Sequence, residues 1–258
     1  MFKQVSTVFL LFLLTSVSTL AFDHSHVDFD QVLKNHVKKD EKGHTTFQYQ
    51  KLQRKPVEFI RYIKNISRVS KSDFEKFSRE EQMAFLINAY NAYTIQLIID
   101  NLPTTSIKKI KGLSPSPWKV NFVRLLGRPM NLDEIESDYL RKKYNDPRIH
   151  FATNSSTKSS PHLRDEAYVA ARLNEQLDSQ TKTFLRNPDL NRLSISENKV
   201  YLSKLFSWFK SDFEQNGQTI YTFLAQHMTD DEKEKEFLKK QPSLDYLDYD
   251  WSLNSAKP

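Results

Sequence analysis

The stretch 80–101 is apolar on almost every side of a helix, and no other feature constrains the fold as strongly. Ser78 and Glu81 stand at its start with the spacing of a capping box, in which each side chain satisfies a backbone amide of the other residue. A helix that is apolar all round is typical of a buried position at the centre of a domain. We therefore expect a long central helix with the rest of the chain packed around it.

Two amides, Asn88 and Asn91, interrupt this apolar surface and share one face of the expected helix. A buried amide without hydrogen-bond partners costs about 1–3 kcal/mol, so each of them needs a partner. We expect both to bind a neighbouring loop or strand end. We also count them as binding candidates, together with Arg148 and Asn154.

Shorter periodic stretches and turns surround the central helix. Helical spacing of apolar residues predicts helices within 22–37, 56–66, 131–140, 167–185, 203–217 and 220–228. Alternation of apolar and polar residues predicts short strands at 45–49, 119–125 and 199–202. The tail 246–254 is rich in aromatic residues, so we expect it to pack back onto the body. The sequence therefore predicts a single helix-rich α+β domain around a central apolar helix, with a small antiparallel sheet.

The first residues have the pattern of a secretory signal peptide, with Lys3, an apolar run at 8–14 and the small residue Ala21 before the expected cleavage. The run is shorter than the roughly 20 apolar residues that a membrane-spanning helix needs. We therefore expect a signal peptide at 1–21, a domain at 22–258 without a transmembrane segment, and export to the periplasm or the extracellular space.

Composition argues against several classes of chemistry. The chain has no cysteine, so a catalytic thiolate, a disulfide and a cysteine metal site are all excluded. Its 38 basic and 32 acidic residues give a net charge of +6, but they are scattered and form no basic stripe, which argues against nucleic acid as a partner. Only four glycines are present, which disfavours a glycine-rich phosphate loop. We expect no cofactor.

The stretch 147–164 carries the strongest candidate site, and its pattern predicts a strand followed by a loop. Alternation would place Arg148, His150 and Asn154 on one face of the strand and mainly apolar residues on the other. The hydroxyl-rich run 155–160 then favours a turn, because Ser and Thr side chains bind local backbone. We expect this loop to lie beside the His150 imidazole.

Hydrolysis would require a nucleophile, a base and a group that orients the base. One part of the chain contains the right residue types for all three roles. Ser155 or Ser160 would be the nucleophile, His150 the base, and Glu136 or Asp146 the orienting group. No nucleophile-elbow motif is present, and such residue types occur near one another in most proteins. On these residues alone, a histidine with a structural role is favoured over triad chemistry.

A metal site is a second alternative, with His150 and His162 as ligands together with Asp165 or Glu166. No His-Glu-x-x-His helix occurs, and the other histidines are scattered along the chain. A structural role is therefore favoured for these side chains, and we expect no metal.

Eight short motifs follow one another along the chain: FLINAYNA at 85–92, PW at 117–118, LDEIE at 132–136, LR at 140–141, DPRIHFA at 146–152, SWF at 207–209, DF at 212–213 and YDWSLN at 249–254. Together they resemble the domain-of-unknown-function family 547 (DUF547), over about residues 22–254. The resemblance implies an exported protein of the bacterial type, without an assigned role. It also implies a papain-like or transglutaminase-like hydrolase fold.

The chain departs from this family at the positions that matter for chemistry. Where members usually have cysteines it has Ser155 and Ser160, and where a histidine is usual it has Ser137. The favoured function is therefore a non-catalytic relative that binds a peptide or a cell-envelope component. The alternative is a serine-dependent hydrolase or acyl transferase that uses Ser155 or Ser160, with His150 as base and Glu136 as the orienting group.

Overall fold

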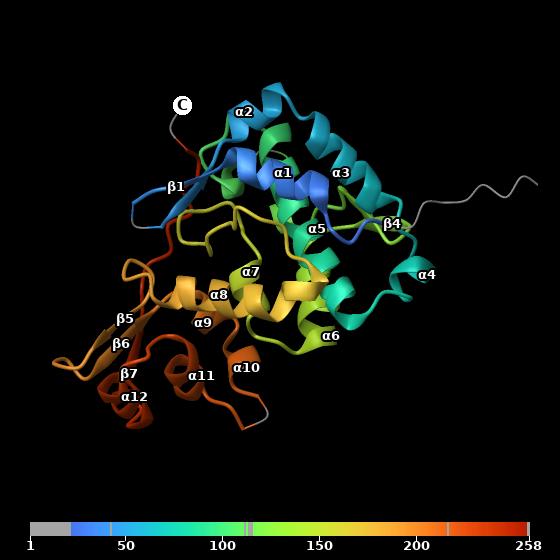
Figure 1. Cartoon of the computed structure of the whole chain (residues 1–258). Helices are drawn as coiled ribbons and strands as arrows, with labels where there is room; N and C mark the ends of the chain where they lie inside the picture. The colour runs from blue at the N-terminus through green and yellow to red at the C-terminus, as the bar shows by residue number, and fades with distance from the viewer. Residues whose placement is uncertain (1–21, 42, 111, 113–115, 216, 257–258) are drawn as a thin grey trace, which may run out of the picture.

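The computed structural model describes residues 22–256 apart from residues 42, 111, 113–115 and 216. The expected signal peptide at 1–21 lies outside the described residues. Helices predominate and are accompanied by three small sheets, so the predicted helix-rich α+β architecture is confirmed (Figure 1). Within the described residues, no helix combines the length and the apolar character needed to cross a membrane.

Helix α5 (Arg79–Asp100) lies at the centre of the fold, as the sequence predicts. Its capping box is present: the Ser78 amide donates to Oε2 of Glu81 at 2.7 Å, and the Glu81 amide donates to the Ser78 hydroxyl at 3.2 Å. Nearly all of its side chains beyond the first turn are buried. The elements packed against it include α2 (Tyr49–Arg54), α3 (Val57–Ser67), the π-helix η3 (Glu134–Arg141) and η4 (Ala170–Arg172).

The remaining helices are mostly short. They are α1 (Val27–His36), α4 (Lys71–Phe74), α6 (Lys142–Tyr144), α7 (Ile149–Ala152), α8 (Leu173–Leu185), α9 (Leu205–Trp208), α10 (Lys210–Phe213), α11 (Ile220–His227), α12 (Glu232–Lys239) and the turns η1 (Ile107–Lys109) and η2 (Pro117–Lys119). In Figure 1, α8 crosses between helices α1–α3 and the C-terminal elements drawn in orange and red.

Two of the sheets are antiparallel pairs, β1 (Val37–Lys39) with β2 (Thr45–Phe47) and β3 (Val123–Leu125) with β4 (Arg128–Met130). In the third sheet, β6 (Lys199–Leu202) pairs antiparallel with β5 (Arg192–Ser194) and parallel with β7 (Ser243–Tyr246). Strands are thus present in all three predicted stretches. The third sheet is mixed rather than antiparallel throughout.

The aromatic tail packs back onto the body, as predicted. Leu253 forms a bridge with Thr157, and Ser255 forms one with Phe47. The Lys158 amide also donates to the carbonyl of the tail residue at position 252, at 2.9 Å. The tail therefore contacts both the first hairpin and the loop 155–160.

Two apolar clusters meet at α7. One surrounds α5 and includes Ile149 and Ala152, whereas the other is built largely from α8, α9 and α11 and includes Phe151. Neighbouring side chains of this single turn therefore belong to different cores, and α7 joins the two halves of the molecule.

The strand expected at 147–154 is wrong, because this segment forms the helical turn α7. The Thr153 amide donates to the Ile149 carbonyl at 3.1 Å, and no described strand pairs with the segment. Apolar and polar residues alternate here, yet both sets are buried between the two clusters. Alternation therefore does not distinguish an inner from an outer face at this place.

The helix expected from residue 167 begins later, with η4 and then α8. The Asn88 side chain donates to the Tyr168 carbonyl at 2.7 Å and accepts from the Tyr168 amide at 3.0 Å. The amide and carbonyl of Tyr168 are thus paired with a side chain instead of forming the hydrogen bonds of a helix. Two smaller differences are that the helix expected at 203–217 is divided into α9 and α10, and that the strand expected from residue 119 begins at Val123.

Candidate functional site

A cavity of about 160 Å³ lies where η2, η3, α7, α9 and the C-terminal tail meet. Its walls contain aromatic rings, two acids and parts of the loop that follows α7: Tyr90, Trp118, Asp133, Glu136, His150, Thr153, Ser155, Pro161, Leu205, Trp208, Phe209, Tyr249 and Trp251. All three tryptophans of the chain are among these residues. The structure thus brings together three of the predicted site residues, Glu136, His150 and Ser155.

His150 is held by α7 with its side chain only 1% exposed. Its Nε2 lies 2.8 Å from Oδ2 of Asp212, whereas its Nδ1 has no hydrogen-bond partner and lies 3.8 Å from Oε1 of Glu136. The Phe209 ring stacks on the imidazole with 4.0 Å between ring centroids. The imidazole is therefore fixed in orientation while one of its nitrogens remains available.

Asp212 on α10 determines which nitrogen carries the proton. Burial alone would raise the pKa of Asp212, but hydrogen bonds from His150 and Arg141 outweigh this and hold that pKa well below its usual range; Arg141 binds through Nε at 2.6 Å and Nη2 at 3.0 Å. Burial lowers the pKa of His150 although the Asp212 carboxylate opposes this, so we assign a neutral ring at pH 7. Nε2 then donates to Asp212, and the lone pair of Nδ1 remains free.

Glu136 comes from the π-helix η3, a type of turn that is frequent at functional sites. Burial raises the pKa of Glu136 to about 7; Arg141 opposes the shift, and Asp133 and Asp212 add to it. Its Oε1 is the acid oxygen near Nδ1 of His150. Near neutral pH this carboxyl group is present in both protonation states.

Ser155 reaches the cavity wall, where its hydroxyl interacts with two phenols. One is Tyr90 of α5 and the other is Tyr249 of the tail. The Tyr249 hydroxyl also lies 2.8 Å from the Thr157 hydroxyl. Burial raises the pKa of Tyr249 to about 12 and raises that of Tyr90 well above its ordinary value, so both phenols keep their protons.

Ser160, the other predicted nucleophile, lies inside the loop and is 1% exposed. Its hydroxyl donates to the Thr157 carbonyl at 2.7 Å and accepts from Nδ2 of Asn154 at 3.1 Å. Asn154 also donates to the Pro161 carbonyl at 2.6 Å. These bonds close the loop on itself. A nucleophilic role for Ser160 stays a prediction.

The amides of α5 bind backbone before and after the loop 155–160, as the sequence predicts. Asn91 donates to the Ala152 carbonyl at 2.9 Å and accepts from the Asn154 amide at 2.8 Å, so it fixes the exit from α7. Asn88 makes the corresponding pair of bonds with residue 168. Contact of either amide with a ligand stays a prediction.

Arg148 and Asp146 bind each other, with Nη2 of Arg148 2.6 Å from Oδ2 of Asp146. Arg148 also pairs with Asp178 of α8 at 2.7 Å. Asp146, the alternative orienting group, is therefore engaged by an arginine, while the carboxylate that binds His150 is Asp212.

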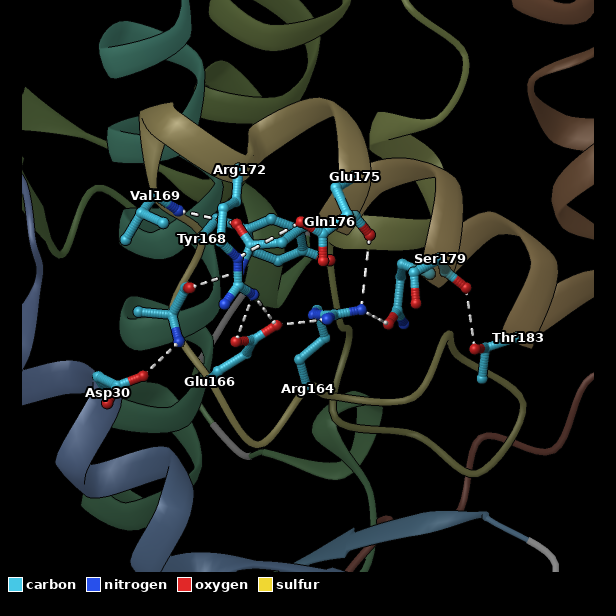
Figure 2. A network of polar contacts seen from close by, with 12 residues as sticks. Asp30, Arg164, Glu166, Tyr168, Val169, Arg172, Glu175, Gln176, Ser179 and Thr183 are labelled. Carbon is cyan, nitrogen blue, oxygen red and sulfur yellow. Dashed lines mark hydrogen bonds and ion pairs between the residues drawn. The ribbon is translucent and has the colours of Figure 1, made fainter.

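A second charged network holds the segment after the loop (Figure 2). Arg164 pairs with Glu166, which also accepts from Arg172 at 2.8 and 2.7 Å. Burial would raise the pKa of Glu166, but bonds from Arg164, Gln176 and Arg172 lower it to about 2. Glu166, one of the candidate metal ligands, is thus committed to two arginines.

The other candidate metal ligands lie apart from one another. The His162 ring contacts the His44 ring, with 5.1 Å between centroids, whereas His150 binds Asp212. No cluster of three or more metal-binding side chains occurs in the part of the chain that the structure describes.

Sequence reasoning missed Asp212 and the aromatic wall as parts of the site. Asp212 lies 62 residues after His150, too far for local spacing to connect them. Three motifs in the sequence could have indicated these parts of the site. DF at 212–213 supplies the partner of the imidazole, and SWF at 207–209 and YDW at 249–251 supply several of the rings.

Comparison with known families gives a match inside the chain. Residues 74–185 match the model of a family described as "Protein of unknown function, DUF547". No curated protein and no solved structure gives a significant match. The resemblance to the DUF547 family, expected over about residues 22–254, is therefore confirmed over residues 74–185, which contain Glu136, His150 and both candidate serines.

Proposed function

We propose that this protein is exported to the periplasm or the extracellular space and binds a peptide or a cell-envelope component in the aromatic cavity, without catalysing a reaction there. The observation that carries the proposal is the state of the cavity's polar groups. Nδ1 of His150 makes no hydrogen bond, and the Ser155 hydroxyl interacts with Tyr90 and Tyr249 instead.

A serine nucleophile depends on a base within hydrogen-bond reach, because its hydroxyl is far less acidic than a thiol. Ser155 has two phenols that stay protonated as its neighbours, and phenols of this kind do not accept its proton at neutral pH. The chain resembles a family that usually has cysteine where this chain has Ser155. This supports a scaffold that has kept its cleft and lost its nucleophile.

Tryptophan fluorescence tests binding directly, since all three tryptophans line the cavity. Titration with short peptides and soluble envelope fragments is expected to change the emission of the mature protein for at least one of them, with saturation. The matched control is Trp208→Phe, which is expected to reduce the signal. If no peptide and no envelope fragment changes the emission or protects the protein against thermal unfolding, the binding proposal is wrong.

Export is tested separately by fractionation of expressing cells and N-terminal sequencing of the recovered chain. We expect the chain outside the cytoplasm with a new terminus near Phe22. Recovery of the intact chain in the cytoplasm would contradict this part of the proposal.

A serine-dependent hydrolase or acyl transferase is the second candidate, and one observation favours it. The neutral His150 has a free lone pair on Nδ1, fixed by Asp212, in the same cavity as Ser155. A fluorophosphonate probe separates the two functions. Labelling at Ser155 that disappears in His150→Ala would support the hydrolase and overturn the proposal of binding alone, whereas an unlabelled protein with a saturable ligand supports binding.

A further inference from the structure

The cavity presents acceptors and negative charge rather than basic groups. Asp133, Glu136 and His150 line it, and no lysine or arginine is among the residues on its wall in the described part of the chain. This is unexpected in a chain with a net charge of +6. The guanidinium of Arg141 lies 4.8 Å from the ring centroid of Phe209, and its nitrogens bind Asp212.

Six tyrosine, tryptophan and phenylalanine rings form most of the remaining wall, and several of them lie close to one another. The ring centroids of Tyr249 and Trp251 are 4.4 Å apart, and those of Trp208 and Tyr249 are 4.9 Å apart. The faces of such rings attract cations, and grouped aromatic rings recognise ammonium ligands. One ring of the wall already attracts a cation of the chain itself: Nζ of Lys108 lies 3.3 Å from the ring centroid of Trp251.

A buried and unpartnered acceptor provides an independent observation. Nδ1 of His150 has no hydrogen-bond partner, although the side chain is 1% exposed. Ten buried side-chain atoms lack a partner in the part of the chain that the structure describes, and only this one belongs to a residue on the cavity wall. It gains from a donor that reaches it. Oε1 of Glu136 stands 3.8 Å from it, so a donor placed between them would satisfy both atoms.

We infer that the cavity binds a primary alkylammonium group, such as the side-chain end of a lysyl residue in a peptide or envelope polymer. This inference rests on the proposed binding function and names its ligand class. An ammonium group has three N–H donors and no acceptor, which matches the carboxylates and the imidazole nitrogen. The methylene stem lies against the aromatic rings, as long cationic side chains do at apolar surfaces.

The test uses three probes of matched shape: Nα-acetyl-lysine amide, its neutral Nα-acetyl-norleucine counterpart, and the Nε-trimethylated lysine derivative. Tryptophan emission of the mature protein at pH 8 gives the dissociation constants. The lysine probe is expected to bind at least about tenfold more tightly than the norleucine probe, because only the former carries charge and donors. It is also expected to bind at least about threefold more tightly than the trimethylated probe, which keeps the charge and lacks donors.

Glu136→Gln is the informative variant, since it keeps shape and removes the charge. Glu136→Gln is expected to weaken binding of the lysine probe by about tenfold and to leave binding of the norleucine probe unchanged. Asp138→Asn on the same helix η3 is the matched control, because Asp138 is half-exposed, pairs with Lys142 and lies outside the cavity wall. Far-ultraviolet circular dichroism of both variants verifies that they fold.

The pH dependence gives a second readout. Asp133, Asp212, Arg141 and His150 surround Glu136. Since Glu136 ionises near pH 7, affinity for the lysine probe is expected to rise between pH 6 and 8 in the native protein and to stay level in Glu136→Gln.

The outcomes separate the inference from the proposed function. Equal binding of the lysine and norleucine probes would overturn the ammonium ligand and leave a binding cavity. Equal binding of the trimethylated probe would overturn the role of the donors. Silence of all three probes would overturn the inference by itself, whereas the proposed function falls only if the peptides and envelope fragments are silent as well.

Discussion

The segment from residue 148 to residue 164 has two sides that differ in how their polar groups are satisfied. On one side, Asn154 and Ser160 bond to each other, and Asn91 bonds to the backbone. On the other side, His150 and Ser155 face the cavity, and Nδ1 of His150 has no partner. Two serines five positions apart thus belong to different environments: Ser160 stabilises the loop, and Ser155 lies on the cavity wall beside Tyr90 and Tyr249.

This difference teaches how a small loop serves a site. A polar group that is fully bonded inside the protein contributes stability and has little left to offer a ligand. A buried polar group without a partner costs stability, and it gains a hydrogen bond when a ligand supplies one. Substitutions on the bonded side should therefore change the free energy of unfolding. Substitutions on the cavity side should change how fast a reagent reaches the side chain, or how stability depends on pH.

Asn91→Leu should have the largest effect on stability. Asn91 is 3% exposed, and its loss leaves the Ala152 carbonyl and the Asn154 amide unsatisfied in the core. At about 1–3 kcal/mol for each orphaned group, we expect a loss of about 4 kcal/mol. Urea unfolding measures it. The control Asn65→Leu, at an exposed position of α3, should change stability by less than about 0.5 kcal/mol, and a similar loss in both variants would contradict the comparison.

Cysteine substitution should separate the two serines by accessibility. The chain has no cysteine, so Ser155→Cys and Ser160→Cys each create a single reporter. We expect iodoacetamide to alkylate Ser155→Cys about a hundredfold faster at pH 8, because residue 160 is buried and needs a local opening first. Alkylation rates within about threefold of each other would show that the two sides are not distinct.

How far the sequence predicts these two sides depends on the range of the interactions. Helix α5 was predictable because its cap and its apolar residues are local features. The partners of Asn88 and Asn91 were predictable in kind, since a buried amide must bind backbone. The form of α7 was not predictable, because burial between two clusters hides the periodicity on which strand and helix assignments depend.

The cavity shows the same limit more clearly. His150, Glu136 and Ser155 were identified by residue type, and the structure brings them together. Ser160 is of the same type and lies in the same loop, yet it lies inside the loop. Asp212 comes from α10 and Tyr249 from the tail, so only the tertiary fold reveals which serine lies in the same cavity as the imidazole.

Glu136→Gln should reveal the cavity side through pH dependence. Below about pH 4.5 the carboxyl group is protonated in both folded and unfolded chains. As the pH rises to 7 it ionises first in the unfolded chain, because the folded pKa is about 7, and the free energy of unfolding falls. Gln removes this loss. The variant should be more stable than the native protein by about 3 kcal/mol at pH 8 and nearly equal to it at pH 4.5.

Urea unfolding at pH 4.5, 6 and 8 measures this difference. Asp138→Asn, on an exposed part of the same helix, should leave the pH profile unchanged. If Glu136→Gln is less stable than the native protein at every pH, the ionised Glu136 contributes favourable bonds and the unpaired character of the cavity side is wrong.

The smallest expected effect concerns the hydroxyl groups themselves. Ser160→Ala removes the bonds to the Thr157 carbonyl and to Asn154 inside a closed loop, so we expect a loss of about 1 kcal/mol. Ser155→Ala should cost less than about 0.5 kcal/mol, because Tyr90 and Tyr249 can turn to other partners at the cavity wall. Thermal unfolding of the two variants and of the double variant measures both values. Since no hydrogen bond joins the two serine side chains, their effects should add. A larger loss for Ser155→Ala would mean that this hydroxyl belongs to the loop's own framework, and the division between the two sides would then run elsewhere.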